Sequence, residues 1–121
     1  MNIGIHRFLF IFVFIKKKNV QMKLTNEFEP IRVWADKRDI FTQGTVDGQL
    51  NKLEEETQEV RDAIESGDEK AFIDAIGDTI ISAVNLAKMK GFDAEHCVNM
   101  AYNEIKDRKG KMLNGEFVKN I

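Results

Sequence analysis

Residues 68–91 read DEKAFIDAIGDTIISAVNLAKMKG, and this stretch decides the fold class. Asp68 stands where a side chain can cap the first turn of a helix, and Gly91 follows Lys88 and Lys90 as a stop signal. Between them, apolar residues recur every three or four positions and form one broad face: Phe72, Ile73, Ile76, Ile80, Ala83, Val84 and Ala87. The pattern predicts an amphipathic helix, which we expect to be the longest and most buried element.

Three more helices are predicted around this stretch, each beginning at a capping residue or a proline and ending at or before a glycine or a turn. They cover about residues 30–39, 45–66 and 93–109. In the last of them, Cys97, Val98, Ala101 and Ile105 share one face and are expected to point inward.

The C-terminal residues 111–118, KMLNGEFV, place Asn114-Gly115 between two short apolar-bearing runs, which is the strongest local signal for a two-residue β-hairpin. A lone hairpin is marginally stable and must pack on the helices or on a partner chain. The sequence thus predicts an all-α fold, a four-helix bundle with a short hairpin. So small a bundle leaves broad apolar stripes to cover, so we expect a homo-oligomer, a dimer or tetramer.

Acidic residues crowd between residues 54 and 78, where ten acids stand against two bases and give a charge of −8. A solvated helix face is the plainer explanation of such a run. Glu55, Glu56 and Glu59, however, are spaced to gather on one side of the predicted helix, where like charges oppose helix formation by a few tenths of a kcal/mol per pair. This cost favours a functional role for the three carboxylates.

A second polar group lies on the neighbouring helix, where Asp74, Asp78 and Asn85 fall within roughly 60° of one another. Gly77 stands directly before Asp78 at a cost of roughly 1 kcal/mol relative to Ala, which predicts close approach of another group. If the two helices pack antiparallel, the acids of both can face one another. Clustered carboxylates need cations, and oxygen ligands suit Mg²⁺ or Mn²⁺ rather than zinc.

Basic residues gather where the last helix is predicted to end, at Lys106, Arg108, Lys109 and Lys111. They could balance the charge of a polyphosphate bound near the acids. Complementation of the helix dipole explains them equally well.

The quoted motifs together resemble those of the MazG-like, all-α nucleoside triphosphate pyrophosphohydrolases. The runs KLEEETQEV (residues 52–60), DAIGD (74–78) and VNLAKMKGFDAE (84–95) carry the likeness, and the tail AYNEIKDRKGKMLNGEFVK (101–119) looks like the small bacterial and phage-type members. The resemblance implies Mg²⁺-dependent hydrolysis of a nucleoside or deoxynucleoside triphosphate to the monophosphate and pyrophosphate.

The resemblance also assigns site residues. Its first motif, E-x-x-E, falls on Glu56 and Glu59 with Glu55 adjoining, and these three with the Asp of the second motif, Asp78, are the catalytic candidates. The second motif is normally E-x-x-D, and Ala75 occupies its Glu position here. We expect Asp74 to stand in, so the candidate metal ligands are Glu56, Glu59, Asp74 and Asp78.

For the substrate, the resemblance suggests that Lys52 and Asn85 lie nearby and that Trp34 contacts the base. Trp34 could instead anchor the core, and Cys97 is expected to be a small core residue. Arg108, Lys109 and Lys111 complete the predicted substrate contacts. Base and sugar stay open, and a phosphoribosyl-ATP substrate, a non-catalytic nucleotide- or metal-binding protein of the same fold and a structural helical adaptor are the alternatives.

Charge sets the remaining expectations. Residues 1–21 carry four basic and no acidic side chains, so with a total of −2 the rest of the chain has a charge of −6 and does not suit a nucleic-acid polymer. The apolar run 8–15 would span about 12 Å as a helix, against roughly 30 Å of bilayer core, so no membrane partner is expected. We expect residues 1–21 to lie outside a domain of 22–121 in which translation starts at Met22. A single cysteine gives no sign of an oxidising compartment, which favours the cytoplasm.

Overall fold

The computed structural model describes residues 21–121, so the predicted extension 1–21 lies almost wholly outside the described residues. The described elements are helices α2 (Glu29–Asp36), α3 (Ile40–Gln43), α4 (Val46–Ser66), α5 (Glu69–Met89) and α6 (Ala94–Ile105) and strands β1 (Gly110–Leu113) and β2 (Glu116–Lys119). The predicted all-α fold with a C-terminal hairpin is confirmed, with five helices instead of four in this part of the chain. Within the same residues, no helix is both long and apolar enough to cross a membrane.

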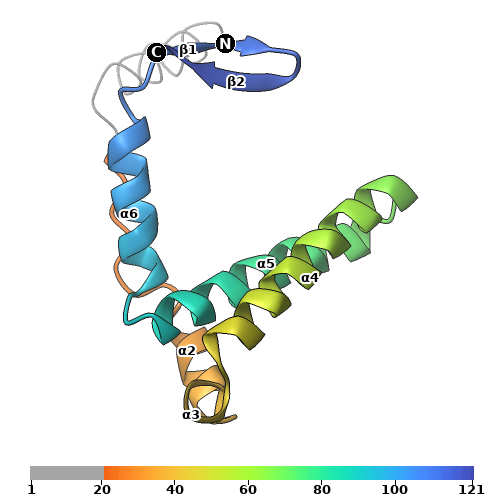
Figure 1. Ribbon diagram of the computed structural model, residues 1–121, viewed down its shortest axis with the longest axis vertical. Coiled ribbons are helices and arrows are strands. Elements are labelled where there is room, and N and C mark those ends of the chain that lie inside the picture. The colour runs from red at the N-terminus through yellow and green to blue at the C-terminus, as the bar shows by residue number, and fades with distance from the viewer. Residues whose placement is uncertain (1–20) are drawn as a thin grey trace, which may run out of the picture.

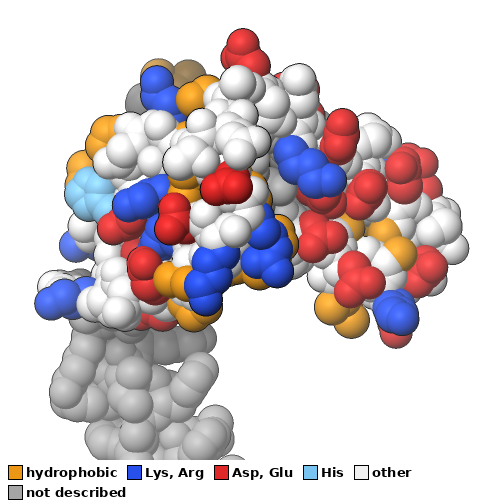
Figure 2. All heavy atoms as spheres, turned by 90° about the horizontal axis from the view of Figure 1, so that it is seen from below, with side chains coloured by type: hydrophobic (Ala, Val, Ile, Leu, Met, Phe, Trp, Pro, Cys, Tyr) orange, Lys and Arg blue, Asp and Glu red, His pale blue; other side chains and the backbone are white. Residues whose placement is uncertain are grey.

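Helices α4 and α5 form an antiparallel pair that makes one arm of the molecule (Figure 1). Thr45 caps α4 by accepting a hydrogen bond from the Gly48 amide at 2.9 Å, and Asp68 caps α5 by accepting one from the Ala71 amide at 3.0 Å. Gly67 turns the chain between them with a φ of 70°. Acidic side chains crowd the face of this arm seen in Figure 2. Both helices have 21 residues, so α5 is not the longer one as predicted.

The predicted helix over 30–39 is two helices. Asp39 adopts a left-handed conformation with a φ of 61°, which an α-helix of L-residues cannot continue through. Helix α2 therefore ends at Asp36, and a single further turn, α3, follows. Both pack near the start of α4 and the end of α5 (Figure 1).

Helix α6 ends at Ile105, about one turn earlier than predicted, because residues 106–109 lead into the hairpin. Gly110 is not a helix stop but the first residue of β1, paired with Lys119. A Cβ at Gly110 would collide with the Val118 carbonyl oxygen and the Phe117 ring, so the pairing requires glycine there. The predicted two-residue turn at Asn114-Gly115 is present, and both of its residues have positive φ.

The core of the described residues is small. Its buried apolar members are Ala35, Ala63, Ala75, Val84 and Ala94. The buried polar and charged members are equally numerous: Arg32, Glu56, Ser82, Asn85 and Glu95. These buried polar groups need hydrogen-bond or ionic partners, because burying them without partners is costly.

The prediction that Cys97, Val98, Ala101 and Ile105 face inward is wrong, because all four are exposed. Helix α6 leaves the α4–α5 arm at a steep angle and carries the hairpin beyond its far end (Figure 1). Only the first turn of α6 is buried, at Ala94 and Glu95. Cys97 is thus not a core residue, since none of the elements described over residues 21–121 covers its face of the helix.

Many large apolar side chains on α6 and the hairpin are exposed in the described chain: Val98, Met100, Ile105, Met112, Leu113, Phe117 and Val118. Both strands are exposed along their whole length. An uncovered apolar surface of this extent is typical of an interface rather than of a free monomer surface.

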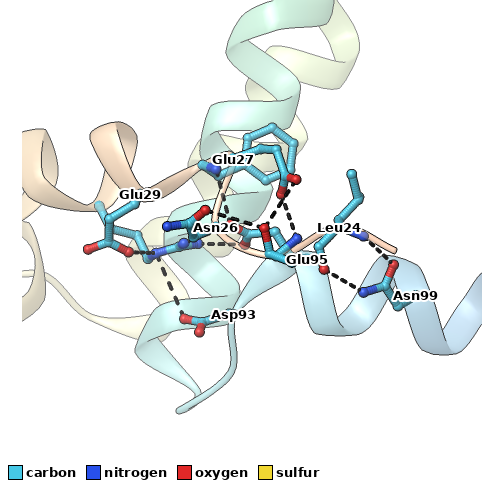
Figure 3. Close-up of polar contacts among 10 residues, drawn as sticks. Leu24, Asn26, Glu27, Glu29, Asp93, Glu95 and Asn99 are labelled. Atoms are coloured by element: carbon cyan, nitrogen blue, oxygen red, sulfur yellow. Dashed lines mark hydrogen bonds and ion pairs between the residues drawn. The ribbon is translucent and has the colours of Figure 1, made fainter. Parts of the chain in front are cut away.

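An ion pair between Arg32 on α2 and Glu95 on α6 joins the two ends of the described helical chain (Figure 3). The Arg32 Nη1 and Nη2 atoms each donate to a Glu95 carboxylate oxygen at 2.8 Å, and both residues are buried, at 4% and 1% exposure. The guanidinium lowers the pKa of Glu95 to about 2, and Glu95 raises that of Arg32. A bidentate pair of this kind fixes orientation as well as distance.

We expect this pair to make the protein acid-sensitive. Because the pKa of Glu95 falls from 4.5 to about 2 on folding, its contribution is complete above about pH 4.5 and is lost as the pH falls toward 2. Glu95→Gln should cost about 3 kcal/mol of unfolding free energy at pH 7, and the difference from wild type should shrink near pH 3. Urea unfolding followed by circular dichroism measures both values, and an equal difference at the two pH values would contradict the prediction.

Candidate metal and nucleotide site

Three carboxylates meet where α4 and α5 pack together. Glu56 and Glu59, one turn apart on α4, and Asp78 on α5 each offer one oxygen, and these oxygens all lie within 4.8 Å of one another. Glu56 is buried at 5% exposure, whereas Glu59 and Asp78 are exposed. The antiparallel packing expected from the acidic motifs therefore brings the two motifs together.

The electrostatics of this cluster are unbalanced. Glu56 Oε1 pairs with Lys52 Nζ at 3.1 Å, which raises the pKa of Lys52 above its ordinary value. The Glu56 carboxylate also raises the pKa of Glu59, through a shared hydrogen bond and charge repulsion. Glu56 Oε2 is buried and accepts no hydrogen bond from any described residue. A buried, unpaired carboxylate oxygen is costly without a partner.

These donors fit a divalent cation. A cation beside Glu56 Oε2 would satisfy the unpaired oxygen and offset the repulsion among the three carboxylates. All three side chains offer carboxylate oxygens, which hard divalent cations prefer, and the exposure of Glu59 and Asp78 leaves room for water and phosphate oxygens.

A cavity of about 620 Å³ opens beside the acidic cluster. Its lining residues come from α2, α3, α4 and α5: Pro30, Ile31, Trp34, Ile40, Gln49, Lys52, Glu56, Asp78, Ile81, Ser82 and Asn85. The charged lining residues come from α4 and α5, whereas α2 and α3 supply apolar and aromatic residues, here called the apolar end of the cavity. Trp34 is 46% exposed and does not anchor the core, which rejects that alternative.

Asn85 supplies a second unpaired polar group in this cavity. It is 3% exposed, and its Oδ1 has no hydrogen-bond partner among the described residues. The nearby Gln49 side chain, in contrast, is held by donating to the Ser82 carbonyl oxygen at 3.1 Å. A buried amide oxygen without a partner, on a residue that lines a cavity, is suited to a hydrogen-bond donor of a ligand.

The remaining predicted acids lie at the margin of the cluster. Glu55 is exposed, lies 4.0 Å from Lys52 Nζ and belongs neither to the three-carboxylate cluster nor to the cavity lining. Asp74 does not join the three oxygens; it lines a neighbouring hollow of about 540 Å³ that Glu59 and Asp78 also border. Ala75 is buried in that hollow's wall. Gly77 has no described atom within 4 Å of an added Cβ, so the expected close approach is not made here.

The basic residues lie elsewhere. Arg108 and Lys109 border a hollow at the end of α6 together with Lys119, and Lys111 lies on β1. Helix α6 separates this region from the α4–α5 arm (Figure 1). Within one chain, Lys52 is therefore the one basic side chain among the described residues that line the cavity.

Sequence reasoning missed several lining residues that helical spacing could have found. Gln49 precedes Lys52 and Glu56 by three and seven positions, and Ile81 and Ser82 follow Asp78 by three and four, so they share a face with the recognised residues. Ile40 had no such signal, because its place depends on the break at Asp39.

The sequence profile described as the MazG nucleotide pyrophosphohydrolase domain matches residues 45–113, more than half of the chain. The chain belongs to the MazG family. No curated protein and no solved structure matched it.

The MazG family is a family of nucleotide pyrophosphohydrolases, and its members typically use a divalent metal. The matched residues include all of α4, α5 and α6 and β1, and hence the whole acidic cluster. They exclude α2, which supplies the aromatic wall of the cavity. The acidic cluster of this MazG chain therefore lies inside the match, whereas the cavity residues that come from α2 and α3 lie outside it.

Proposed function

We propose that this MazG protein hydrolyses a nucleoside or deoxynucleoside triphosphate to the monophosphate and pyrophosphate, with Mg²⁺ as cofactor and Mn²⁺ as a substitute. The observation that carries the proposal is the unpaired, buried Glu56 Oε2 at the meeting point of three carboxylates, beside a cavity with an aromatic wall. The oxygen of a water molecule bonds to the α-phosphorus. The bond between the α-phosphorus and the oxygen that bridges it to the β-phosphorus breaks, and pyrophosphate leaves.

Glu56, Glu59 and Asp78 would hold the cation. Asp74 would add a fourth carboxylate to the metal site from the neighbouring hollow. When bound, a divalent cation acidifies water and offsets phosphate charge. Lys52 orients Glu56 and offers a positive charge to the phosphates, since it is half-exposed at the cavity. Glu55, exposed beside Lys52, would accept the proton of the attacking water.

The nucleoside would occupy the apolar end of the cavity. Trp34 offers an exposed ring for stacking against the base, with Ile31 and Ile81 beside it. Asn85 would bond to a polar edge of the base or to a sugar hydroxyl. Phosphoribosyl-ATP carries the same triphosphate group and is the alternative substrate.

We further propose a homo-oligomer in which a second copy supplies Arg108, Lys109 and Lys111 to the phosphates. Two observations support it. These residues lie beyond α6, away from the cavity of their own chain, and the apolar surface of α6 and the hairpin around them is uncovered. A second copy packed on this surface would bury the apolar residues. It would also bring its positive charge to the acidic α4–α5 arm of the first copy. The domain would comprise residues 22–121 and act in the cytoplasm, where its substrates are.

Turnover tests the proposal directly. The protein is incubated with Mg²⁺ and each common ribonucleoside and deoxyribonucleoside triphosphate, and with phosphoribosyl-ATP, and pyrophosphate is measured. Pyrophosphate and the monophosphate in equal amounts support the proposal, whereas orthophosphate and a diphosphate would contradict attack at the α-phosphorus. A second candidate, nucleotide binding without turnover, is favoured by Ala75 at the position of a usual ligand, and binding without pyrophosphate would support it.

We expect Mg²⁺ or Mn²⁺ to raise the thermal midpoint. A ligand that binds only the folded protein adds about 2.7 kcal/mol at one hundred times its dissociation constant, and the three oxygens converge only after folding. Differential scanning fluorimetry in chelator and in saturating Mg²⁺ measures the shift. Asp78→Asn should reduce it, and an identical melt with and without the metal would contradict a metal site here.

A further inference from the structure

Helix α2 carries Pro30, Ile31 and Trp34 to the cavity but has little apolar anchoring of its own. Of its eight residues, only Arg32 and Ala35 are buried. Val33 and Trp34 are exposed. The apolar contacts of α2 are therefore too few to fix how the helix is rotated about its axis, although that rotation decides where Trp34 stands.

Polar contacts from the first two turns of α6 supply the missing anchoring (Figure 3). The Glu95 carboxylate accepts one hydrogen bond from each terminal nitrogen of Arg32, both at 2.8 Å. Its Oε2 also accepts a hydrogen bond from the backbone amide of Phe28, the N-cap residue of α2, at 3.1 Å. One turn further along α6, Asn99 accepts from the Leu24 amide at 3.0 Å and donates to the Leu24 carbonyl oxygen at 2.8 Å. Glu95 thus holds α2 at its start and one turn inside.

The surroundings of Arg32 make this hold directional. Glu29 accepts from its Nε at 2.9 Å and Asp93 lies 3.8 Å from the same atom, so acids face the guanidinium from α2 and from the residue before α6. Arg32 and Ile31 are adjacent on the helix and point about 100° apart. Fixing Arg32 in one plane therefore also fixes the direction of Ile31 and, one turn on, of Trp34.

We propose that Arg32 and Glu95 are positioning residues that set the aromatic wall of the cavity and thereby the affinity for the nucleoside end of the substrate. The inference rests on the function proposed above for this cavity. Neither residue lines the cavity or belongs to the acidic cluster, so the pair acts through α2 alone. Loss of the pair lets α2 turn and moves Trp34, while the carboxylates on α4 and α5 stay in place.

Glu95→Gln tests the proposal, because it keeps the side-chain volume and removes the charge. We expect KM for the best nucleotide to rise about tenfold and kcat to stay within about twofold, since the loss is confined to substrate binding. Trp34 is the sole tryptophan of the chain, so its emission maximum and its quenching by acrylamide report the movement of α2 without any substrate. Both should change in Glu95→Gln. Arg32→Lys keeps the charge but cannot form the two parallel bonds, and should give an intermediate effect.

Asp68→Ala is the matched control. It removes the N-cap of α5 and lowers stability without touching α2 or the cavity, so KM and Trp34 emission should be unchanged. A folded Glu95→Gln protein with wild-type KM and emission would overturn the proposal, as would an equal loss of kcat. Should Glu95→Gln not fold, wild-type KM and emission in Arg32→Lys would overturn it equally.

Failure of the proposed function gives a different result. If the wild-type protein releases no pyrophosphate, titration of Trp34 emission with ATP and with dCTP in chelator still measures nucleotide binding. Weaker binding in Glu95→Gln with a shifted emission then supports the positioning role alone. Unchanged binding and emission overturn it, whatever the turnover assay shows.

Discussion

Glu56→Gln is expected to lower turnover by about a hundredfold or more while the protein stays folded. The change keeps the shape of the side chain but removes the charge of the buried carboxylate that joins the acidic cluster to Lys52. Without that charge the site holds a cation less tightly and activates water less well. Steady-state pyrophosphate release measures the loss, and far-UV circular dichroism checks the fold.

Glu54→Gln is the matched control for this variant. Glu54 lies on the same helix two residues away, is exposed and does not belong to the acidic cluster, so the same chemical change there should leave turnover within about twofold. Turnover by Glu56→Gln within tenfold of wild type would remove Glu56 from the site.

A pair of mixed dimers is expected to show that the basic residues act on the partner's site. Replacing Arg108, Lys109 and Lys111 together by Ala should lower turnover by about a hundredfold, because charge-assisted bonds to phosphates are lost. A dimer of this variant with a Glu56→Gln chain, isolated through two affinity tags, should regain about half of wild-type activity, since one of its two sites is intact.

The reciprocal dimer gives the control. It joins a wild-type chain to a chain with all four changes, so neither site has both wild-type acids and a partner's wild-type bases, and we expect it to be inactive. If the basic residues serve their own chain, the two results exchange: the first dimer is inactive and the second keeps half of the activity. That exchange would contradict the proposed arrangement of the oligomer.

The local elements followed from the sequence because their causes are local. Thr45, Asp68 and Gly67 set the ends of α4 and α5 through contacts within four residues, and Asn114-Gly115 set the hairpin turn. Spacing along two helices placed Glu56, Glu59 and Asp78 on faces that could meet. Asp39 and Gly110 were misread because each depends on a neighbouring element: the packing of α3 and the pairing of β1 with β2.

What the sequence alone determined is the set of helices, the hairpin, the family motifs and which acids share a face, because helical period and capping act over a few residues. Only the tertiary structure decided that Trp34 lines a cavity, that Asp74 stands outside the cluster, that Arg32 meets Glu95 and that Cys97 is exposed. Arg32 and Glu95 are 63 residues apart, and the angle at which α6 leaves the α4–α5 arm governs their meeting. Such contacts depend on how whole elements pack, and no periodicity within one element records that packing.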